Sequence, residues 1–162
     1  MNAAITAPTE RALTLTRVFD APRDLVWAAW TDPRHAAQWW GPRHHPSTHV
    51  EIDARVGGRW RICLKSIADG RELWHGGVFR EVVRPERLVF TFAWDTGDGP
   101  AEENLVTITL AEEGSAGGRK TRMEFRQEPF VSADEHAGHT EGWSSSFDRL
   151  DDLLVAWKGP SR

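Results

Sequence analysis

Five histidines lie in two short groups whose spacing could suit a metal ion. They are His44, His45 and His49, followed much later by His136 and His139. Imidazole is a common zinc ligand, and spacings of three or four residues can bring rings onto one ion. Pro46 interrupts the first group at a loop–strand boundary, and no nearby carboxylate completes that site. The single Cys63 excludes a Cys-based cluster. We therefore expect no metal and no other cofactor.

Nucleophilic catalysis would need an activated side chain, and the segment GWSSSF offers Ser144, Ser145 and Ser146. This segment lacks the G-x-S-x-G strand–turn–helix context. The glycine pairs in VGGRW and HGGVF lie inside predicted strands, where no phosphate-binding loop forms. The adjacent Asp151 and Asp152 are expected at the solvent edge of a helix. We assign no catalytic residue from these patterns.

Three other side chains could supply polar groups to an apolar site. Arg17 follows Leu13 and Leu15 in an alternating segment, so it points inward, and a buried charge needs a partner. That partner is either a carboxylate in a structural salt bridge or an anionic ligand. His75, beside a glycine pair on an inner strand, is a candidate polar group of a cavity, and Glu141 is a third.

Aromatic usage is unusual, with nine Trp, seven Phe and no Tyr. Trp is large and seldom fully buried, so this number indicates a lined cavity or a broad contact face, or a core that is simply rich in Trp. Trp39 and Trp40 stand directly before Gly41-Pro42. Because neighbours on a helix point about 100° apart, Trp40 is expected to pack beside Ala36 and Trp39 to face the cavity mouth. The alternative is that both pack against a neighbouring helix.

The residues between these side chains predict the elements that carry them. A strand pattern in RALTLTRVFDAP is followed by a short helix at about 22–30 and another that begins at Asp32 and ends by Trp40. Strand patterns then recur in THVEIDARVGG, GRWRICLKS, ELWHGGVFREVV, RLVFTFAWD, NLVTITLAE and KTRMEFRQ. On the inner faces we expect Leu64 and Phe90 in the core, and a cavity lined by Trp60, Ile62, Phe92 and Trp94.

The last segment changes to a helical period. One apolar stripe predicts a helix of roughly 26 residues; it consists of Thr140, Trp143, Phe147, Leu150, Leu154 and Trp157. Trp143 and Phe147 would face the cavity from this helix. Gly138 and Gly142 each cost a helix about 1 kcal/mol relative to Ala. Either close packing on the sheet or room for a ligand must compensate for that cost.

Length and composition fit one ordinary globular domain: 162 residues, 40% hydrophobic and 27% charged. We expect residues 1–10 to form a loose leader and residues 11–158 to form a single domain. Its fold class is α+β, because a curved antiparallel sheet of six to seven strands must cover its apolar face with the long C-terminal helix. The two short helices after the first strand would close one end.

Four stretches of the chain together resemble a known family. They are RVFDAPRDLVWAAWTDPRHAAQWWGP, VGGRWRI, GGVFREVVRPERLVFTFAW and GHTEGWSSSFDRLDDLL. This ordered set, within residues 11–157, is similar to the activator of Hsp90 ATPase homologue-like (AHSA1-like) domain of the START/Bet v 1-like (SRPBCC) superfamily. The resemblance implies the helix-grip fold, a sheet that holds a C-terminal helix around an internal cavity. It also implies that WWGP lies at the cavity entrance.

Charge and leader composition restrict the partners. The net charge is −4 and the basic residues are scattered, so we expect no nucleic-acid binding. No secretory signal pattern and no apolar run of membrane-spanning length appears, so we expect no membrane partner and a cytoplasmic location. A homodimer is an open alternative.

These observations favour binding of a small, mostly apolar or aromatic molecule in the internal cavity. One alternative is an enzyme of cyclase or hydrolase type, which would place a titratable group with a shifted pKa inside the cavity. Another is a chaperone-interaction module of the Hsp90-activator kind, which would need a large exposed apolar patch. The eukaryotic activators carry a further N-terminal domain that a short leader cannot supply, so a chaperone partner is not expected.

Overall fold

The computed structural model describes residues 12–96, 102–114 and 120–158, so the predicted leader at residues 1–10 lies outside the described residues. The strands are β1 (Leu13–Phe19), β2 (Ser47–Ile52), β3 (Arg59–Lys65), β4 (Glu72–Val83), β5 (Arg87–Trp94), β6 (Asn104–Glu113) and β7 (Lys120–Glu128). The helices are α2 (Arg23–Thr31), α3 (Pro33–Ala36) and α4 (Ala133–Lys158). All seven strands form one sheet in the order β1-β7-β6-β5-β4-β3-β2, and the paired strands are antiparallel.

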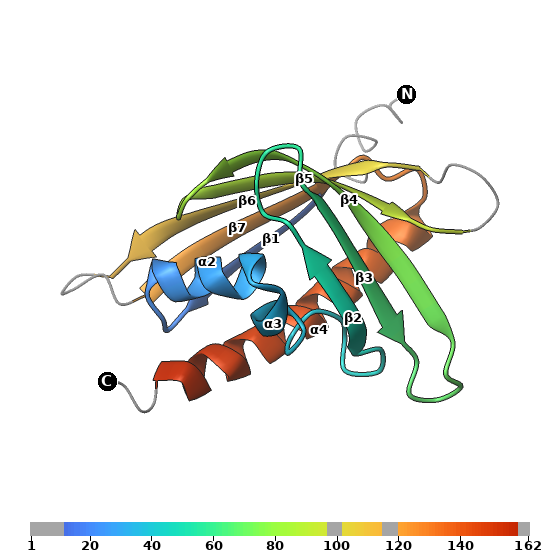
Figure 1. The fold of residues 1–162 in the computed structure, drawn as a ribbon, viewed down its shortest axis with the longest axis horizontal. Coiled ribbons are helices and arrows are strands. Elements are labelled where there is room, and N and C mark those ends of the chain that lie inside the picture. Colours follow the sequence, from blue (N-terminus) through green and yellow to red (C-terminus); the bar gives the residue numbers. More distant parts are fainter. Residues whose placement is uncertain (1–11, 97–101, 115–119, 159–162) are drawn as a thin grey trace, which may run out of the picture.

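The sheet curves around α4, which crosses its inner face, while α2 and α3 cover the remaining part of that face (Figure 1). This is the predicted α+β helix-grip arrangement, with two short helices after the first strand. Among the described residues, no helix has both the length and the apolar character that crossing a membrane would require.

Neighbouring strands approach β4 closely at its two glycines. A Cβ atom on Gly77 would lie 1.9 Å from the carbonyl oxygen of Thr91, and one on Gly76 would lie 2.3 Å from that of Trp60. Any side chain at these positions would push the neighbouring strands away. The pairing of β4 with β5 also shifts register between Phe79 and Glu81. The close approach and the shifted register let this long strand curve around the helix.

The predicted second short helix ends earlier than expected. Asp32 caps α3 as predicted, because its Oδ1 accepts the backbone N–H of Arg34 at 2.9 Å. Helix α3 nevertheless ends at Ala36 rather than near Trp40, and the chain continues in turns. Gly41 follows with a φ of 103°, a left-handed conformation that suits glycine. The two tryptophans therefore lie in a turn.

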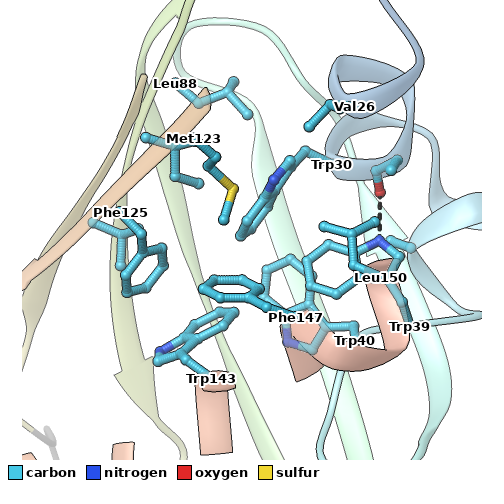
Figure 2. Close-up of a cluster of buried hydrophobic side chains, with 14 of the residues drawn as sticks. Val26, Trp30, Trp39, Trp40, Leu88, Met123, Phe125, Trp143, Phe147 and Leu150 are labelled. Atoms are coloured by element: carbon cyan, nitrogen blue, oxygen red, sulfur yellow. Dashed lines mark hydrogen bonds between the residues drawn. The ribbon is translucent and has the colours of Figure 1, made fainter. Parts of the chain in front are cut away.

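Helix α4 has the predicted length of 26 residues. Its N-terminus is capped by Ser132, whose Oγ accepts the backbone N–H of Glu135 at 3.0 Å. Four stripe residues are buried, and Thr140 and Trp157 are half-buried; the buried ones are Trp143, Phe147, Leu150 and Leu154. They contact a core centred on Trp30 of α2 (Figure 2). The ring centroid of Trp30 lies 6.1 Å from that of Phe147 and 6.4 Å from that of Phe125 on β7.

Replacing Phe147 tests this packing. Phe147→Ala removes a fully buried ring between helix and sheet, so we expect the free energy of unfolding to fall by about 3–5 kcal/mol. Denaturant unfolding measures this loss. Val155→Ala is the matched control, because Val155 is an apolar residue of the same helix that is 54% exposed. A loss below about 1 kcal/mol for Phe147→Ala would contradict the packing of α4 on the sheet.

Candidate functional site

A cavity of about 320 Å³ lies between the N-terminal half of α4 and strands β3, β4 and β5. Most of its wall is apolar or aromatic. The larger of these side chains are Trp40, Leu64, Leu73, Phe92, Trp94 and Trp143. Strand alternation places the sheet residues on the inner face, since Leu64, Leu73, Phe92 and Trp94 lie on strands that curve over the helix.

Helix α4 contributes small residues to this wall at four-residue spacing: Gly138, Gly142 and Ser146. A Cβ atom on either glycine would meet no other atom within 4 Å. Of the two compensations considered for these helical glycines, the structure therefore shows open space rather than close packing against the sheet.

The mouth of the cavity lies beside the first turns of α4. Glu135 and Gly138 are exposed there, and His45 in the loop after α3 is half-buried. Arg149 of α4 fixes this loop, because its guanidinium donates to the carbonyl oxygens of Gly41 at 2.8 Å and Gln38 at 3.0 Å. The loop edge of the cavity is thus tied to the same helix that forms the opposite wall.

His75 lies in the wall between its strand neighbours Ile62 and Trp94. Its side chain is buried, and its Nε2 accepts the indole N–H of Trp40 at 3.1 Å. The proton of the neutral ring is therefore on Nδ1, which has no hydrogen-bond partner among the described residues. Burial lowers the pKa of His75 to about 3, and His139 adds to this shift.

His139 repeats this arrangement from the helix side. Its Nε2 accepts the indole N–H of Trp94 at 3.1 Å, and its Nδ1 donates to Oε1 of the buried Gln127 at 3.2 Å. The same Gln127 oxygen accepts the indole N–H of Trp143 at 2.8 Å. Burial, and secondarily the nearby His136, lower the pKa of His139 to about 4. Both cavity histidines are therefore uncharged at neutral pH.

The structure brings together half of the ten predicted ligand-binding residues. Those that line the cavity are Trp40, His75, Phe92, Trp94 and Trp143. The other five do not line it: Trp39, Trp60, Ile62, Phe147 and Arg17.

The structure places Trp39 differently from the expected position at the cavity mouth. Trp39 is fully buried, and its indole N–H donates to the carbonyl oxygen of Ala29 at 2.9 Å (Figure 2). Its ring centroid lies 4.7 Å from that of Trp30, so it belongs to the core. Trp40 is packed as expected, because it is 4% exposed and belongs to the core cluster, and it also lines the cavity. The backbone N–H groups of Trp39 and Trp40 both donate to the carbonyl oxygen of Ala36, at 3.2 Å and 2.9 Å, so one further turn follows α3. That turn directs the indole of Trp39 towards Ala29 of α2 instead of the cavity mouth.

Three further apolar residues that were predicted to line the cavity belong to the core. Ile62 and Phe147 are fully buried, and Trp60 is 3% exposed. The indole N–H of Trp60 donates to the carbonyl oxygen of Thr91 at 3.0 Å, and its ring lies behind Trp40 at a centroid distance of 5.3 Å. Trp60 supports the cavity wall from behind.

Two charged residues that were predicted as polar groups of the cavity also lie outside it. Arg17 faces the helix as expected, but it is only half-buried and forms an ion pair of 3.0 Å with Asp148. It also donates to the carbonyl oxygen of Ser144 at 3.1 Å. This is the salt-bridge alternative, in which the arginine joins β1 to α4. Glu141 is exposed and does not line the cavity.

Sequence reasoning missed Glu135 and His139 as wall residues. A signal was available, because Glu135, Gly138, His139 and Gly142 follow helical spacings of three and four residues. This row lies beside the apolar stripe, on the same side of the helix. The sequence analysis considered the two glycines for their cost to the helix and His139 only as a possible metal ligand.

The described residues include no group of three or more His, Cys, Asp and Glu side chains that could hold a metal ion. The two histidine groups have other contacts. His49 lies against Glu51, and Nε2 of His136 donates to the carbonyl oxygen of Ala12 at 3.0 Å.

The lowered pKa values of His75 and His139 predict a pH-dependent stability. The folded state favours the neutral rings, so it has its full stability above the unfolded pKa of 6.5. Stability is lost as the pH falls towards the folded pKa values of about 4 for His139 and about 3 for His75. By pH 5 each histidine should remove up to about 2 kcal/mol from the free energy of unfolding. His139→Gln should reduce this loss in urea unfolding at pH 7 and pH 5. His44→Gln, at an exposed position, is the control; equal pH dependence in both variants would contradict the assignment.

Comparison with known proteins identifies the family. The family model described as "Activator of Hsp90 ATPase homolog 1-like protein" matches residues 20–155. No curated protein matches the chain. Protein CV1439 from Chromobacterium violaceum is 30% identical, with a TM-score of 0.78 and coverage of 89% of this chain and 97% of that protein. Protein Ms6760 from Mycobacterium smegmatis is 28% identical, with a TM-score of 0.75 and coverage of 91% and 93%.

A third solved structure shares the fold at lower identity. The AHSA1 protein from Silicibacter pomeroyi is 24% identical, with a TM-score of 0.78 and coverage of 90% of this chain and 98% of that one. The family match spans most of the chain, including the loop, strands and helix that form the cavity. The chain is therefore a member of the activator of Hsp90 ATPase homolog 1-like family and has the helix-grip fold of that family.

Proposed function

We propose that this protein binds a small, mostly apolar molecule in the cavity between β3–β5 and α4. The volume of about 320 Å³ falls at the lower end of the range for small-molecule sites. Such sites combine an apolar wall with a few polar groups, and this wall combines three indoles and a phenyl ring with two neutral imidazoles. Flat aromatic walls favour a ligand that is itself flat or aromatic.

The observation that carries the proposal is the open space in front of Gly138 and Gly142. Both positions are helical, and alanine there would stabilise the helix by about 1 kcal/mol each. Neither glycine is needed for a tight contact, because a Cβ atom would touch nothing within 4 Å. A helix that served only to pack on the sheet would gain from larger residues at both positions. A volume that is kept open for a ligand explains why larger residues are absent at positions 138 and 142.

The cavity histidines favour binding over general acid–base catalysis. An enzyme of this kind would need a titratable group with a shifted pKa inside the cavity, and the pKa values of both histidines are strongly shifted. The shift, however, moves both groups away from the operating range near pH 7, where a general base is effective. The Nε2 atoms of both rings are also occupied by indole N–H groups. The hydroxyl of Ser146, which also lines the cavity, donates to the carbonyl oxygen of Gly142 at 2.9 Å. It is therefore not hydrogen-bonded to either histidine as an activated nucleophile would be.

A surface for docking a chaperone has less support than the cavity. Among the described residues, the exposed large apolar side chains each come from a different segment. They are Val18, Val56, Ile67, Val83, Leu105, Val131 and Val155. We therefore place the ligand-binding surface inside the molecule.

Filling the cavity tests the proposal. Gly142→Leu places a side chain in the open space, so it should weaken binding of the neutral fluorescent probe N-phenyl-1-naphthylamine at least about 10-fold while the fold is retained. Probe fluorescence measures binding, and thermal unfolding checks the fold.

Ala137→Leu is the matched control for this experiment. It adds the same side chain to an exposed position of α4 that does not line the cavity. It should leave probe affinity unchanged. Equal probe binding by wild type, Gly142→Leu and Ala137→Leu would show that the probe binds elsewhere and would refute the cavity as the site.

A further inference from the structure

Most hydrogen-bond donors of the cavity wall already have partners, and the buried Nδ1–H of His75 is the exception. The three indole N–H groups in the wall donate to protein acceptors: Trp40 to His75, Trp94 to His139 and Trp143 to Gln127. The hydroxyl of Ser146 donates to the backbone of its own helix. A ligand therefore meets mainly the faces of aromatic rings, which carry the negative end of the ring quadrupole.

The charge in the wall is also one-sided. Among the described residues that line the cavity, Glu135 is the carboxylate, and no lysine or arginine is present. Glu135 lies with Asp134 in the first turn of α4. Two carboxylates outweigh the roughly half positive charge of a helix N-terminus. The α4 side of the mouth therefore has a negative potential, which the neutral His75 and His139 do not offset. His45 lies on the loop side of the same mouth.

Glu135 shares the cavity wall with an indole ring. It precedes His139 by four residues, so both side chains lie on one face of α4, one turn apart. His139 in turn contacts Trp94, with a ring centroid distance of 5.8 Å. Trp94 is half-buried and lines the cavity together with Glu135. A carboxylate and an indole face on either side of one opening form a suitable site for an organic cation.

We propose that the ligand is an apolar, aromatic amine or quaternary ammonium compound, whose cationic group lies at the mouth between Glu135 and Trp94. This inference rests on the proposed function. The apolar body would occupy the space in front of Gly138 and Gly142. An anionic ligand would meet a wall without cationic side chains and with few available donors, so its charge would lose hydration without compensation.

A matched series of naphthalene compounds tests the charge preference at about pH 8. 1-Naphthylmethylamine is cationic, 1-naphthylmethanol is neutral and 1-naphthylacetate is anionic, while the aromatic body is the same. Isothermal titration calorimetry should give the amine an affinity about 5-fold or more above that of the alcohol, as a carboxylate and a cation–π contact would supply. The acid should bind most weakly.

Glu135→Gln removes the charge and keeps the shape. It should reduce the amine-to-alcohol affinity ratio at least about 3-fold and leave alcohol binding unchanged. Glu141→Gln is the matched control, because Glu141 is an exposed carboxylate of the same helix outside the cavity wall.

The outcomes separate the two proposals. Equal affinities for amine and alcohol, preference for the acid, or the same ratio in Glu135→Gln as in wild type would overturn the cation site and leave apolar binding intact. Failure of all three compounds and of N-phenyl-1-naphthylamine to bind would overturn both. A preference for the amine that Gly142→Leu abolishes supports both.

Discussion

The site depends on the way α4 divides its length between packing and cavity. Phe147, Leu150 and Leu154 of its C-terminal half are fully buried against the sheet and the core around Trp30. This half fixes the helix axis relative to the sheet. The N-terminal half then lies over β3–β5 with Gly138 and Gly142 facing open space. The packing of the C-terminal half thus sets the distance between the N-terminal half and the sheet, and the cavity lies in that space.

Tertiary hydrogen bonds give the cavity wall a defined shape. Oε1 of Gln127 on β7 accepts from both Trp143 and His139, so one sheet residue orients two residues of α4. Arg149 joins the same helix to the loop that carries Trp40. The sheet, helix and loop sides of the cavity are thus connected by hydrogen bonds. Gln127 and Trp143 are buried, so an unsatisfied polar atom on either would be costly. A wall held in this way can present preorganised ring surfaces to a ligand.

The sequence predicted the fold more completely than the site. Strand alternation and the stripe of α4 depend on local periodicity, which is visible in one chain. The cost of helical glycines identified Gly138 and Gly142 as unusual positions, and both face open space in the structure. The side-chain orientation of Trp39 and Trp40 depends on whether a helix continues for one more turn, and Gly41-Pro42 left that undecided. Trp60 and Trp94 both alternate inward on their strands. Which of the two meets a cavity depends on where α4 crosses the sheet, and periodicity does not encode this crossing.

The two buried histidines in an apolar wall are best understood through the indoles they contact. A buried indole N–H needs an acceptor, and a carboxylate in that position would bring a charge that is expensive to bury. An amide would bring two further donors that need partners. A neutral imidazole supplies one acceptor on a flat, largely apolar ring, and its low pKa keeps it in that form. His75 and His139 therefore satisfy the indole N–H groups of Trp40 and Trp94 without adding a charge to the apolar wall.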